Sequence, residues 1–322
     1  MTHNEVKDLN KMHTAPLLRI GTRGSPLAMA QTIEARDQLL ALVPHLDGSD
    51  NVEIKEIKTE GDAILDRPLA EVGGKGLFTK ELDLALLDGR IDIAVHSVKD
   101  VETFLPDGIV LAAYLAREDP RDAFLSLKAD SLSELPFGSV VGSASLRRQA
   151  QIMSNFPDLE VILIRGNVQT RIRKLVDGVV DATMLAQAGL NRLDLAGVAK
   201  SILDPEEMLP AVGQGAIGIT CRADDYRVLD WLSIINHLPT QCCVTAERSM
   251  LATLDGSCRT PIGGLANLSD EGRLRLRGLV AVKDGSEIFK AECTGLIANP
   301  VDLGVKVGKE LRLRAGDVLC IG

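Results

Sequence analysis

The chain has 322 residues, 45% of them hydrophobic and 25% charged, which is the composition of an ordinary globular protein long enough for two or three domains. Its net charge of −9 argues against a general role on nucleic acids or on anionic membrane surfaces. No run of about 18 apolar residues is present, so the sequence predicts no membrane-spanning helix.

Residues 1–16 lack the apolar segment of a signal peptide and carry Glu5 and Asp8, which transit peptides avoid. We predict that this stretch is a disordered tail and that the protein is cytoplasmic. A plastid location is the alternative if the source is a plant or an alga, because a plastid protein stripped of its leader has a similar start.

Short strands alternate with helices from residue 17 to about residue 115. Residues 26–43 begin with a proline and have helical periodicity, with Met29, Ile33, Leu40 and Val43 on the predicted inward face. The serine before that proline, at position 25, is the expected N-cap.

Residues 52–59 alternate like a half-buried strand, residues 76–89 are typical of a helix that ends at a glycine, and residues 91–97 read as a buried strand. Strands separated by helices imply a parallel, or mostly parallel, sheet.

A second α/β unit extends from about residue 120 to residue 209, with predicted strands near 139–143, 159–164 and 180–185. The last part of the chain has a different pattern. It consists of a helix over 240–256, a strand over 273–282, a hairpin turn at 283–286 and a helix over about 300–314. This order is typical of a small α+β domain.

Positive charge gathers in residues 145–174, where six basic residues against two acidic ones give a local net charge of +4. Arginine predominates there, and its guanidinium binds carboxylate or phosphate through two hydrogen bonds. Three predicted strand-to-helix turns carry these arginines, and the N-terminus of a helix favours an anion. The carboxyl ends of strands are also where α/β sheets form ligand clefts.

We therefore interpret one group of arginines as an anion-binding set for a ligand with several negative groups: Arg23, Arg147, Arg148, Arg165 and Arg171. The alternative for each is a solvated charge on a helix surface. We prefer that alternative for Arg173 and Lys174.

The glycine-rich segment around Lys75 suggests a phosphate loop, but Gly76 follows the lysine where the pattern requires Ser or Thr. Nucleotide binding is therefore disfavoured, and Lys75 remains a candidate anion contact.

Four polar residues lie at the end of the predicted strand 91–97 or just after it: His96, Ser97, Lys99 and Asp100. A carboxylate at the carboxyl end of a strand is placed for acid–base or charge-stabilising work. The alternative for Asp100 is that it caps a turn. His96 by itself is more consistent with a structural role.

The six cysteines lie at positions 221, 242, 243, 258, 293 and 320. None forms a C-x-x-C pair and the five histidines have no ligand spacing, so we expect no metal site. Cys258 differs from the others because turn-forming residues surround it.

Taken together, the motifs resemble those of one family, the porphobilinogen deaminases or hydroxymethylbilane synthases. They occur in the family's order between about residue 17 and residue 265. The segments are "IGTRGSPLAMAQ", "KTEGDAILD", "GGKGLFTKELD", "DIAVHSVKD", "REDPRDAF", "GSASLRRQAQ", "RGNVQTR", "AGLNRL", "LPAVGQGAIGI", "TAERSML" and "GSCRTPIGG".

The resemblance implies a transferase that joins four porphobilinogen molecules into the linear tetrapyrrole hydroxymethylbilane and releases ammonia at each step. It implies that Cys258 carries a covalent dipyrromethane cofactor through a thioether, in a loop shaped by Gly256, Pro261 and Gly263. Asp100 matches the catalytic aspartate, which would offset the positive charge left when ammonia departs.

The resemblance also implies which residues bind the acidic groups of the cofactor and substrate. They are Arg23, Ser25, Lys75, Ser97, Lys99, Ser145, Arg147, Arg148, Arg165, Arg171 and Arg192. The expected product partner is uroporphyrinogen III synthase, and a metal-free monomer that binds no nucleic acid is expected.

The implied fold has three domains, of which the first two are like the lobes of a periplasmic binding protein. On that basis domain 1 is 17–115 with 212–236, domain 2 is 116–211, and domain 3 is 237–322 with the cofactor-attachment loop. The small third domain is α+β.

Two positions depart from the family pattern: Glu71 stands where some bacterial members have lysine, and Glu102 where proline is common. Two other functions remain open from the residues alone. A non-enzymatic, two-lobed polyanion receptor would use the same arginines, but it assigns no role to Asp100 or Cys258. A cysteine hydrolase needs a histidine partner that no motif ties to Cys258.

Overall fold

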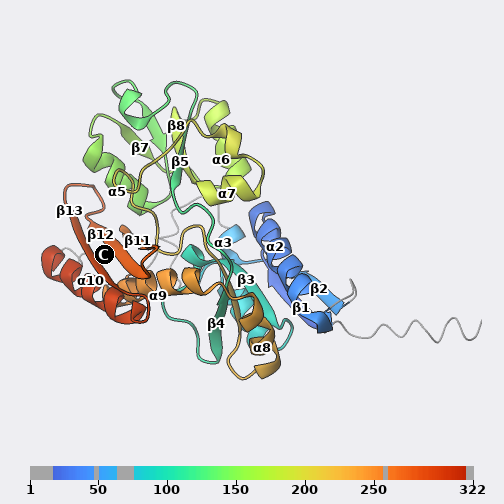
Figure 1. Ribbon diagram of the computed structural model, residues 1–322. Coiled ribbons are helices and arrows are strands. Elements are labelled where there is room, and N and C mark those ends of the chain that lie inside the picture. The colour runs from blue at the N-terminus through green and yellow to red at the C-terminus, as the bar shows by residue number, and fades with distance from the viewer. Residues whose placement is uncertain (1–16, 47–50, 64–75, 257–259, 317–322) are drawn as a thin grey trace, which may run out of the picture.

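The computed structural model of the chain describes residues 17–46, 51–63, 76–256 and 260–316, whose strands form three sheets (Figure 1). Two of these sheets are five-stranded and carry helices, and the third is three-stranded and belongs to a smaller region at the C-terminal end. The expected fold class, two α/β lobes with a small α+β domain, is confirmed.

The first lobe is built on a sheet with strand order β2-β1-β3-β10-β4. Its strands are β1 (Leu18–Thr22), β2 (Val52–Glu56), β3 (Ile93–Ser97), β4 (Ile109–Tyr114) and β10 (Ile217–Arg222). Its helices are α2 (Pro26–Leu42), α3 (Glu60–Ala63), α4 (Lys80–Leu87) and α8 (Tyr226–Ile235).

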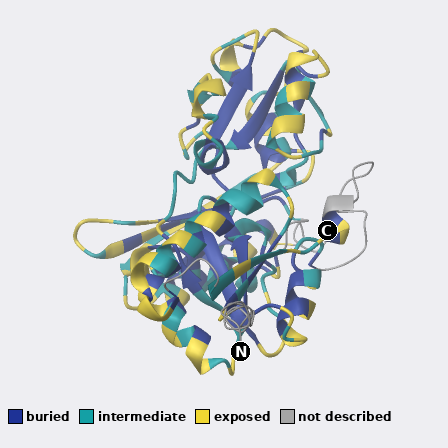
Figure 2. Cartoon of the chain, turned by 90° about the vertical axis from the view of Figure 1, so that its right-hand side faces the viewer, coloured by how far each residue is buried: buried dark blue, intermediate teal, exposed yellow. Residues whose placement is uncertain are grey.

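The second lobe is built on a sheet with strand order β7-β6-β8-β5-β9. Its strands are β5 (Asp122–Ser126), β6 (Val140–Gly142), β7 (Glu160–Ile162), β8 (Ala182–Ala186) and β9 (Ser201–Ile202). Its helices are α5 (Leu146–Asn155), α6 (Val168–Val176) and α7 (Gln187–Arg192). Figure 2 shows the strands of this upper lobe buried beneath helices whose outer sides are exposed.

The prediction of a mostly parallel sheet is only half correct, because in each five-stranded sheet two strand pairs are parallel and two are antiparallel. In the first sheet β1 is parallel to β2 and β3, but β10 is antiparallel to β3 and β4. In the second sheet β6 is parallel to β7 and β8, but β5 is antiparallel to β8 and β9. Both antiparallel strands, β5 and β10, are the first strands that the chain forms after it passes from one lobe to the other.

The predicted inward face of helix α2 is only partly correct: Val43 is buried and Met29 and Leu40 are half-buried. Ile33 is exposed, whereas Thr32, Ala35 and Leu39 are fully buried and Gln31 is nearly so. The side chain of Gln31 is hydrogen-bonded to Ser97 at the end of β3, so part of the inward face is polar. An apolar pattern cannot identify such a face, because it lines a polar site rather than the core. The predicted cap is confirmed, since Ser25 accepts a hydrogen bond from the backbone N–H of residue 28.

The third region is an antiparallel sheet of β11 (Ile262–Leu268), β12 (Arg273–Ala281) and β13 (Ile288–Leu296), with α9 (Leu238–Thr253) and α10 (Pro300–Ala315). The predicted hairpin between β12 and β13 is confirmed. Helices α9 and α10 approach each other so closely at Gly304 that a Cβ there would lie 2.2 Å from the carbonyl oxygen of Ala246.

Two segments connect the lobes, one at 115–121 and one at 210–216, and they touch. The N–H of Glu118 donates to the carbonyl of Gly215 (3.3 Å). Gly215 has φ +88°, and a Cβ there would lie 2.4 Å from the carbonyl oxygen of Glu118. Only glycine fits both the conformation and the contact. Within the described ranges no helix is long and apolar enough to cross a membrane.

Candidate functional site

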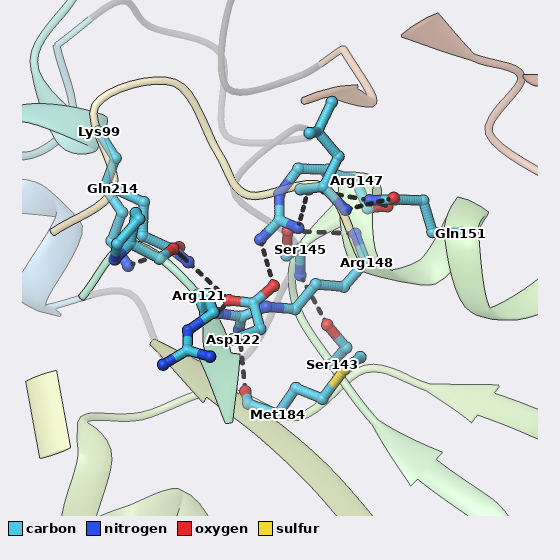
Figure 3. Close-up of polar contacts among 12 residues, drawn as sticks. Lys99, Arg121, Asp122, Ser143, Ser145, Arg147, Arg148, Gln151, Met184 and Gln214 are labelled. Carbon is cyan, nitrogen blue, oxygen red and sulfur yellow. Dashed lines mark hydrogen bonds and ion pairs between the residues drawn. The ribbon is translucent and has the colours of Figure 1, made fainter. Parts of the chain in front are cut away.

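Two neighbouring arginines at the start of α5 share one buried aspartate (Figure 3). Arg147 Nη2 lies 2.9 Å from Asp122 Oδ2, and Arg148 Nη2 lies 2.7 Å from Asp122 Oδ1. All three side chains are buried. Burial by itself raises the pKa of Asp122, but the two guanidinium groups outweigh this effect and hold the pKa below its usual range. The aspartate is therefore charged at neutral pH and neutralises one of the two arginines.

Each arginine also donates to a backbone carbonyl, Arg147 Nη1 to Leu209 (2.7 Å) and Arg148 Nη1 to Met184 (2.8 Å). The Nε atoms of both are buried and have no hydrogen-bond partner among the described residues. A buried donor without a partner is costly, so these two Nε atoms are suited to an anionic ligand. The excess positive charge of this cluster suits a ligand that carries carboxylate groups.

Lys99 joins this cluster from the first lobe. Its Nζ lies 3.5 Å from Gln214 Oε1, and Gln214 Nε2 donates to Asp122 Oδ1 (2.7 Å) and to the carbonyl of Pro120 (2.8 Å). Burial lowers the pKa of Lys99 to about 8; Asp100 opposes this effect, and Arg148 adds to it. Gln214 thus connects the lysine beside Asp100 to the arginine pair of the second lobe.

Asp100 lies at the end of a short 3-10 turn, Val98–Asp100, directly after β3. It lines a small pocket together with Arg23, Ser25, Gln31 and Ser97. Among the described residues no group donates a hydrogen bond to its carboxylate, whose oxygens are therefore available to a ligand. Its charge acts on Lys99 and also on Arg171 of the second lobe.

The other members of this pocket are held in place by local contacts. The guanidinium of Arg23 stacks over the ring of Phe78, 4.1 Å from its centroid. Ser97 Oγ is hydrogen-bonded to the side-chain amide of Gln31 (2.9 Å). The hydroxyl of Ser25 caps α2. Ser145, which does not line this pocket, caps α5 in the same way, so both serines lie at helix N-termini that favour anions.

Arg171 and Arg165 lie at the start of α6, which Asn167 caps. Arg171 Nε donates to the carbonyl of Gly166 (2.9 Å). Burial and the nearby Arg148 lower the pKa of Arg171 to about 10, against the opposing effect of Asp100, and Arg165 also contributes to the lowering. The turn before α6 therefore faces the same region as Asp100 and α5.

Arg192 and Lys174 have surroundings that differ from those expected. Arg192 is held between the lobes, with Nε 2.9 Å from Glu34 Oε2 and Nη1 donating to the carbonyl of Gly215 (3.2 Å). Lys174, interpreted as solvated, is half-buried and donates to the carbonyl of Arg165 (3.1 Å). Arg173 is exposed, as expected.

His96 is buried, and its Nε2 lies 2.8 Å from the hydroxyl of Thr220. Burial, with a smaller effect of Arg23, lowers its pKa to about 4, so it is neutral at neutral pH. The structural role expected for His96 agrees with this contact. Lys75 and Cys258 lie outside the described residues.

Sequence reasoning missed Asp122, Gln214 and Gln31. Asp122 lies in the segment "REDPRDAF". Because a buried arginine needs a carboxylate partner, this acidic segment could have been considered for that role. Gln214 and Gln31 carry no charge, and no signal in the sequence distinguishes them from surface amides. Among the described residues no group of three His, Cys, Asp or Glu side chains is arranged to hold a metal.

Comparison with known proteins places these features in context. Residues 18–230 match the family described as "Porphobilinogen deaminase, dipyromethane cofactor binding domain", and residues 241–312 match "Porphobilinogen deaminase, C-terminal domain". A rice protein (Oryza sativa subsp. japonica) named "Porphobilinogen deaminase, chloroplastic" is 56% identical over 302 residues, which cover 93% of this chain and 84% of the relative.

A "Porphobilinogen deaminase" of the bacterium Paracoccus denitrificans is 54% identical over 298 residues, which cover 92% of this chain and 94% of the relative. Among solved structures, a periplasmic substrate-binding protein of an ABC transporter from Coxiella burnetii is 16% identical with a TM-score of 0.43, and the match covers 71% of this chain and 94% of that one.

Proposed function

The chain belongs to the porphobilinogen deaminase family, and from that premise we propose which of its residues perform the family's reaction. It is a transferase that joins four porphobilinogen molecules into hydroxymethylbilane with release of ammonia, and its cofactor is a dipyrromethane. The relatives are named as porphobilinogen deaminases, which favours the enzyme over the non-enzymatic receptor.

We propose that Cys258 is the attachment residue, on the strength of the motif "GSCRTPIGG". A thiolate sulfur is a soft nucleophile that forms a stable thioether with an electrophilic carbon. When attached, the dipyrromethane supplies the pyrrole from which the new chain grows. The residues that would hold its acidic groups include Arg147 and Arg148, whose Nε atoms have no partner in the described structure, and Lys99.

The substrate's carboxylates would bind at three helix N-termini. Arg23 and Ser25 are at the start of α2, Ser145 is at the start of α5, and Arg165 and Arg171 are at the start of α6. Helix dipoles, free backbone N–H groups and guanidinium groups all favour an anion at these positions. We assign Arg192 a different role: its contacts to Glu34 and to the carbonyl of Gly215 hold the two lobes together.

Asp100 is proposed as the catalytic residue. Its carboxylate lines the pocket without a hydrogen-bond donor from the described residues, so it can accept hydrogen bonds from pyrrole N–H groups. Its negative charge would stabilise the positive charge that develops as ammonia leaves. This placement of an available carboxylate among the cationic groups is the observation that carries the proposed assignment.

Several finer features are also part of the proposal. Lys75 and Ser97 are further anion contacts, the protein acts as a monomer, and its product passes to uroporphyrinogen III synthase. A cytoplasmic or plastid location is proposed, since the relatives include bacterial proteins and a rice protein named as chloroplastic.

The test is intact mass spectrometry of the wild type and of Cys258→Ser in one run. The wild type is expected to exceed its chain mass by one dipyrromethane, and the variant to match its chain mass. A bare wild type that gains mass after porphobilinogen is added is an apoenzyme and supports the assignment. A wild type that never gains mass, or a variant that carries the same added mass, would overturn it.

A further inference from the structure

The three residues after Asp100 connect this residue to two other parts of the molecule. Residues 101–103 contact helix α9 of the third region, and they also contact the end of the turn that precedes Cys258. None of the residues that make these two contacts lines the pocket described above. Together they link the turn that carries the proposed catalytic carboxylate to the chain segment that carries the proposed attachment cysteine.

The first contact is made by Arg248 of α9. Its Nη2 donates to the carbonyls of Glu102 (2.7 Å) and Thr103 (3.1 Å), and its Nη1 lies 3.4 Å from the carbonyl of Val101. The partners of this guanidinium are thus three successive carbonyl oxygens. Burial lowers the pKa of Arg248, which agrees with a cation held mainly by backbone dipoles. A planar group with several donors can bind three carbonyls at once, and a lysine cannot.

The second contact is made by Thr103, whose hydroxyl donates to the carbonyl of Gly256 (2.8 Å). Gly256 packs closely against its neighbours, since a Cβ there would lie 2.5 Å from Ile262 Cδ1 and 2.6 Å from Leu251 Cδ1. Its N–H donates to the carbonyl of Leu251 at the end of α9 (3.0 Å). The backbone two residues before Cys258 is therefore held from α9 and from the Asp100 segment.

Glu102 adds a third contact, since its carboxylate accepts a hydrogen bond from the N–H of Gly76, before α4. Two segments that are distant from each other in sequence, one at residue 76 and one at 248–256, therefore both contact residues 101–103. Since residues 101 and 100 are joined by one peptide bond, a displacement of this segment moves Asp100 with it.

We propose that Arg248 and Thr103 are positioning residues, which set the position of Gly256, the last described residue before Cys258, relative to Asp100. The proposal rests on the proposed function, because it needs the roles given to Asp100 and Cys258. In a reaction that depends on holding two rings in contact geometry, a shift of about 1 Å costs up to about 100-fold in rate. Arg248 and Thr103 therefore act on turnover through the position of other groups, without touching the substrate.

The sharpest test is Thr103→Val, which keeps the shape of the side chain and removes the hydroxyl. The matched control is Thr253→Val on α9, whose hydroxyl donates to the carbonyl of Ser249 within the helix (2.8 Å). Each variant loses one partly buried hydrogen bond, so similar small falls in Tm are expected. Intact mass reports whether the dipyrromethane is attached, and steady-state kinetics with porphobilinogen give kcat and KM.

We expect both variants to carry the cofactor mass. Thr103→Val should lower kcat by about tenfold or more with little change in KM, because misplacement affects the reacting geometry rather than binding. Thr103→Ser should restore kcat, and Thr253→Val should keep it. A Thr103→Val enzyme with wild-type kcat, or a Thr253→Val enzyme with an equal loss, would overturn the positioning role.

Arg248→Lys gives a second measurement. It keeps the charge but loses the three-carbonyl contact, and kcat is expected to fall at least as far as in Thr103→Val. If Arg248→Lys does not fold, the kcat of Thr103→Val still tests the positioning role. Failure of the inference is distinguishable from failure of the proposed function: if Cys258→Ser retains the added mass, the attachment assignment fails whatever Thr103→Val does.

Discussion

The carboxylate of Glu247 is fully buried and is paired with the guanidinium of Arg117 through two contacts, of 2.5 and 3.2 Å. Arg117 lies in the first segment that connects the lobes, and Glu247 lies in α9. The same carboxylate accepts hydrogen bonds from the N–H groups of Gly213 (2.7 Å) and Ala266 (2.8 Å). The carboxylate of Glu247 in α9 therefore binds groups in both connecting segments and in β11, so the third region and the lobe junction are held together at this point.

Glu247→Ala should strongly destabilise the protein. Removal of Glu247 leaves the partly buried guanidinium of Arg117 without its counter-charge, which costs about 3–5 kcal/mol in the free energy of unfolding. The control is Glu292→Ala, which removes an exposed partner of Arg275 and should cost less than about 1 kcal/mol. Urea unfolding of both variants measures the difference, and equal losses would contradict the importance of the buried pair.

Asp122→Asn should also destabilise the protein, because Arg147 and Arg148 would lose their shared counter-charge. A cost of about 3–5 kcal/mol is expected. The folded-state pKa of Asp122 is lowered, so its stabilising contribution is fully present above the unfolded-state pKa of about 4 and is lost as the pH falls below it. The variant should therefore show a shallower loss of stability in acid. Asp158→Asn, on the exposed surface, is the control and should keep the wild-type profile.

The lowered pKa of Lys99 predicts a pH dependence of substrate capture. Since burial brings this pKa to about 8, the free enzyme loses the charge of Lys99 above that pH, and kcat/KM should fall there. Lys99→Arg keeps its positive charge across this range. Dividing the wild-type kcat/KM by that of Lys99→Arg at each pH therefore cancels any effect of substrate ionisation. A ratio that is flat across pH 8 would show that the charge of Lys99 does not assist binding.

The same pKa has a consequence for stability. A lysine whose pKa is lowered on folding binds its proton more tightly in the unfolded state, so from pH about 8 to about 10.4 the contribution of Lys99 to stability rises with pH. The difference in the free energy of unfolding between the wild type and Lys99→Met should change in that window and stay constant below it.

Asp100→Asn should keep the fold and the attached cofactor but lose turnover by about 100- to 1000-fold, because an amide cannot offset positive charge. Asp107→Asn, an exposed aspartate a few residues further along, is the matched control and should keep wild-type turnover. Intact mass and steady-state rates are measured for both. Near-normal turnover of Asp100→Asn with an intact cofactor would remove its catalytic role.

Much of the local structure could be predicted, because it depends on residues that are close in sequence. The cap at Ser25, the hairpin at 283–286 and the final helix all follow from a few neighbouring side chains. The clustering of arginines at helix starts was visible for the same reason. The inward face of α2 was predicted only in part: Val43 is buried, but Ile33 follows the apolar pattern and is exposed, while Gln31 makes the contact with the site.

The sequence by itself determined the fold class, the sign of the charge in the ligand region and, through its motifs, the family. Only the tertiary structure decided that β10 lies between β3 and β4, that one aspartate serves both Arg147 and Arg148, and that Gln214 links Asp122 to Lys99. Gln214 and Asp122 are 92 residues apart in sequence. Their contact exists only because the two segments that connect the lobes lie against each other. Patterns of neighbouring residues determine helices, strands and caps, whereas the pairing of buried charges depends on which distant segments the fold brings together.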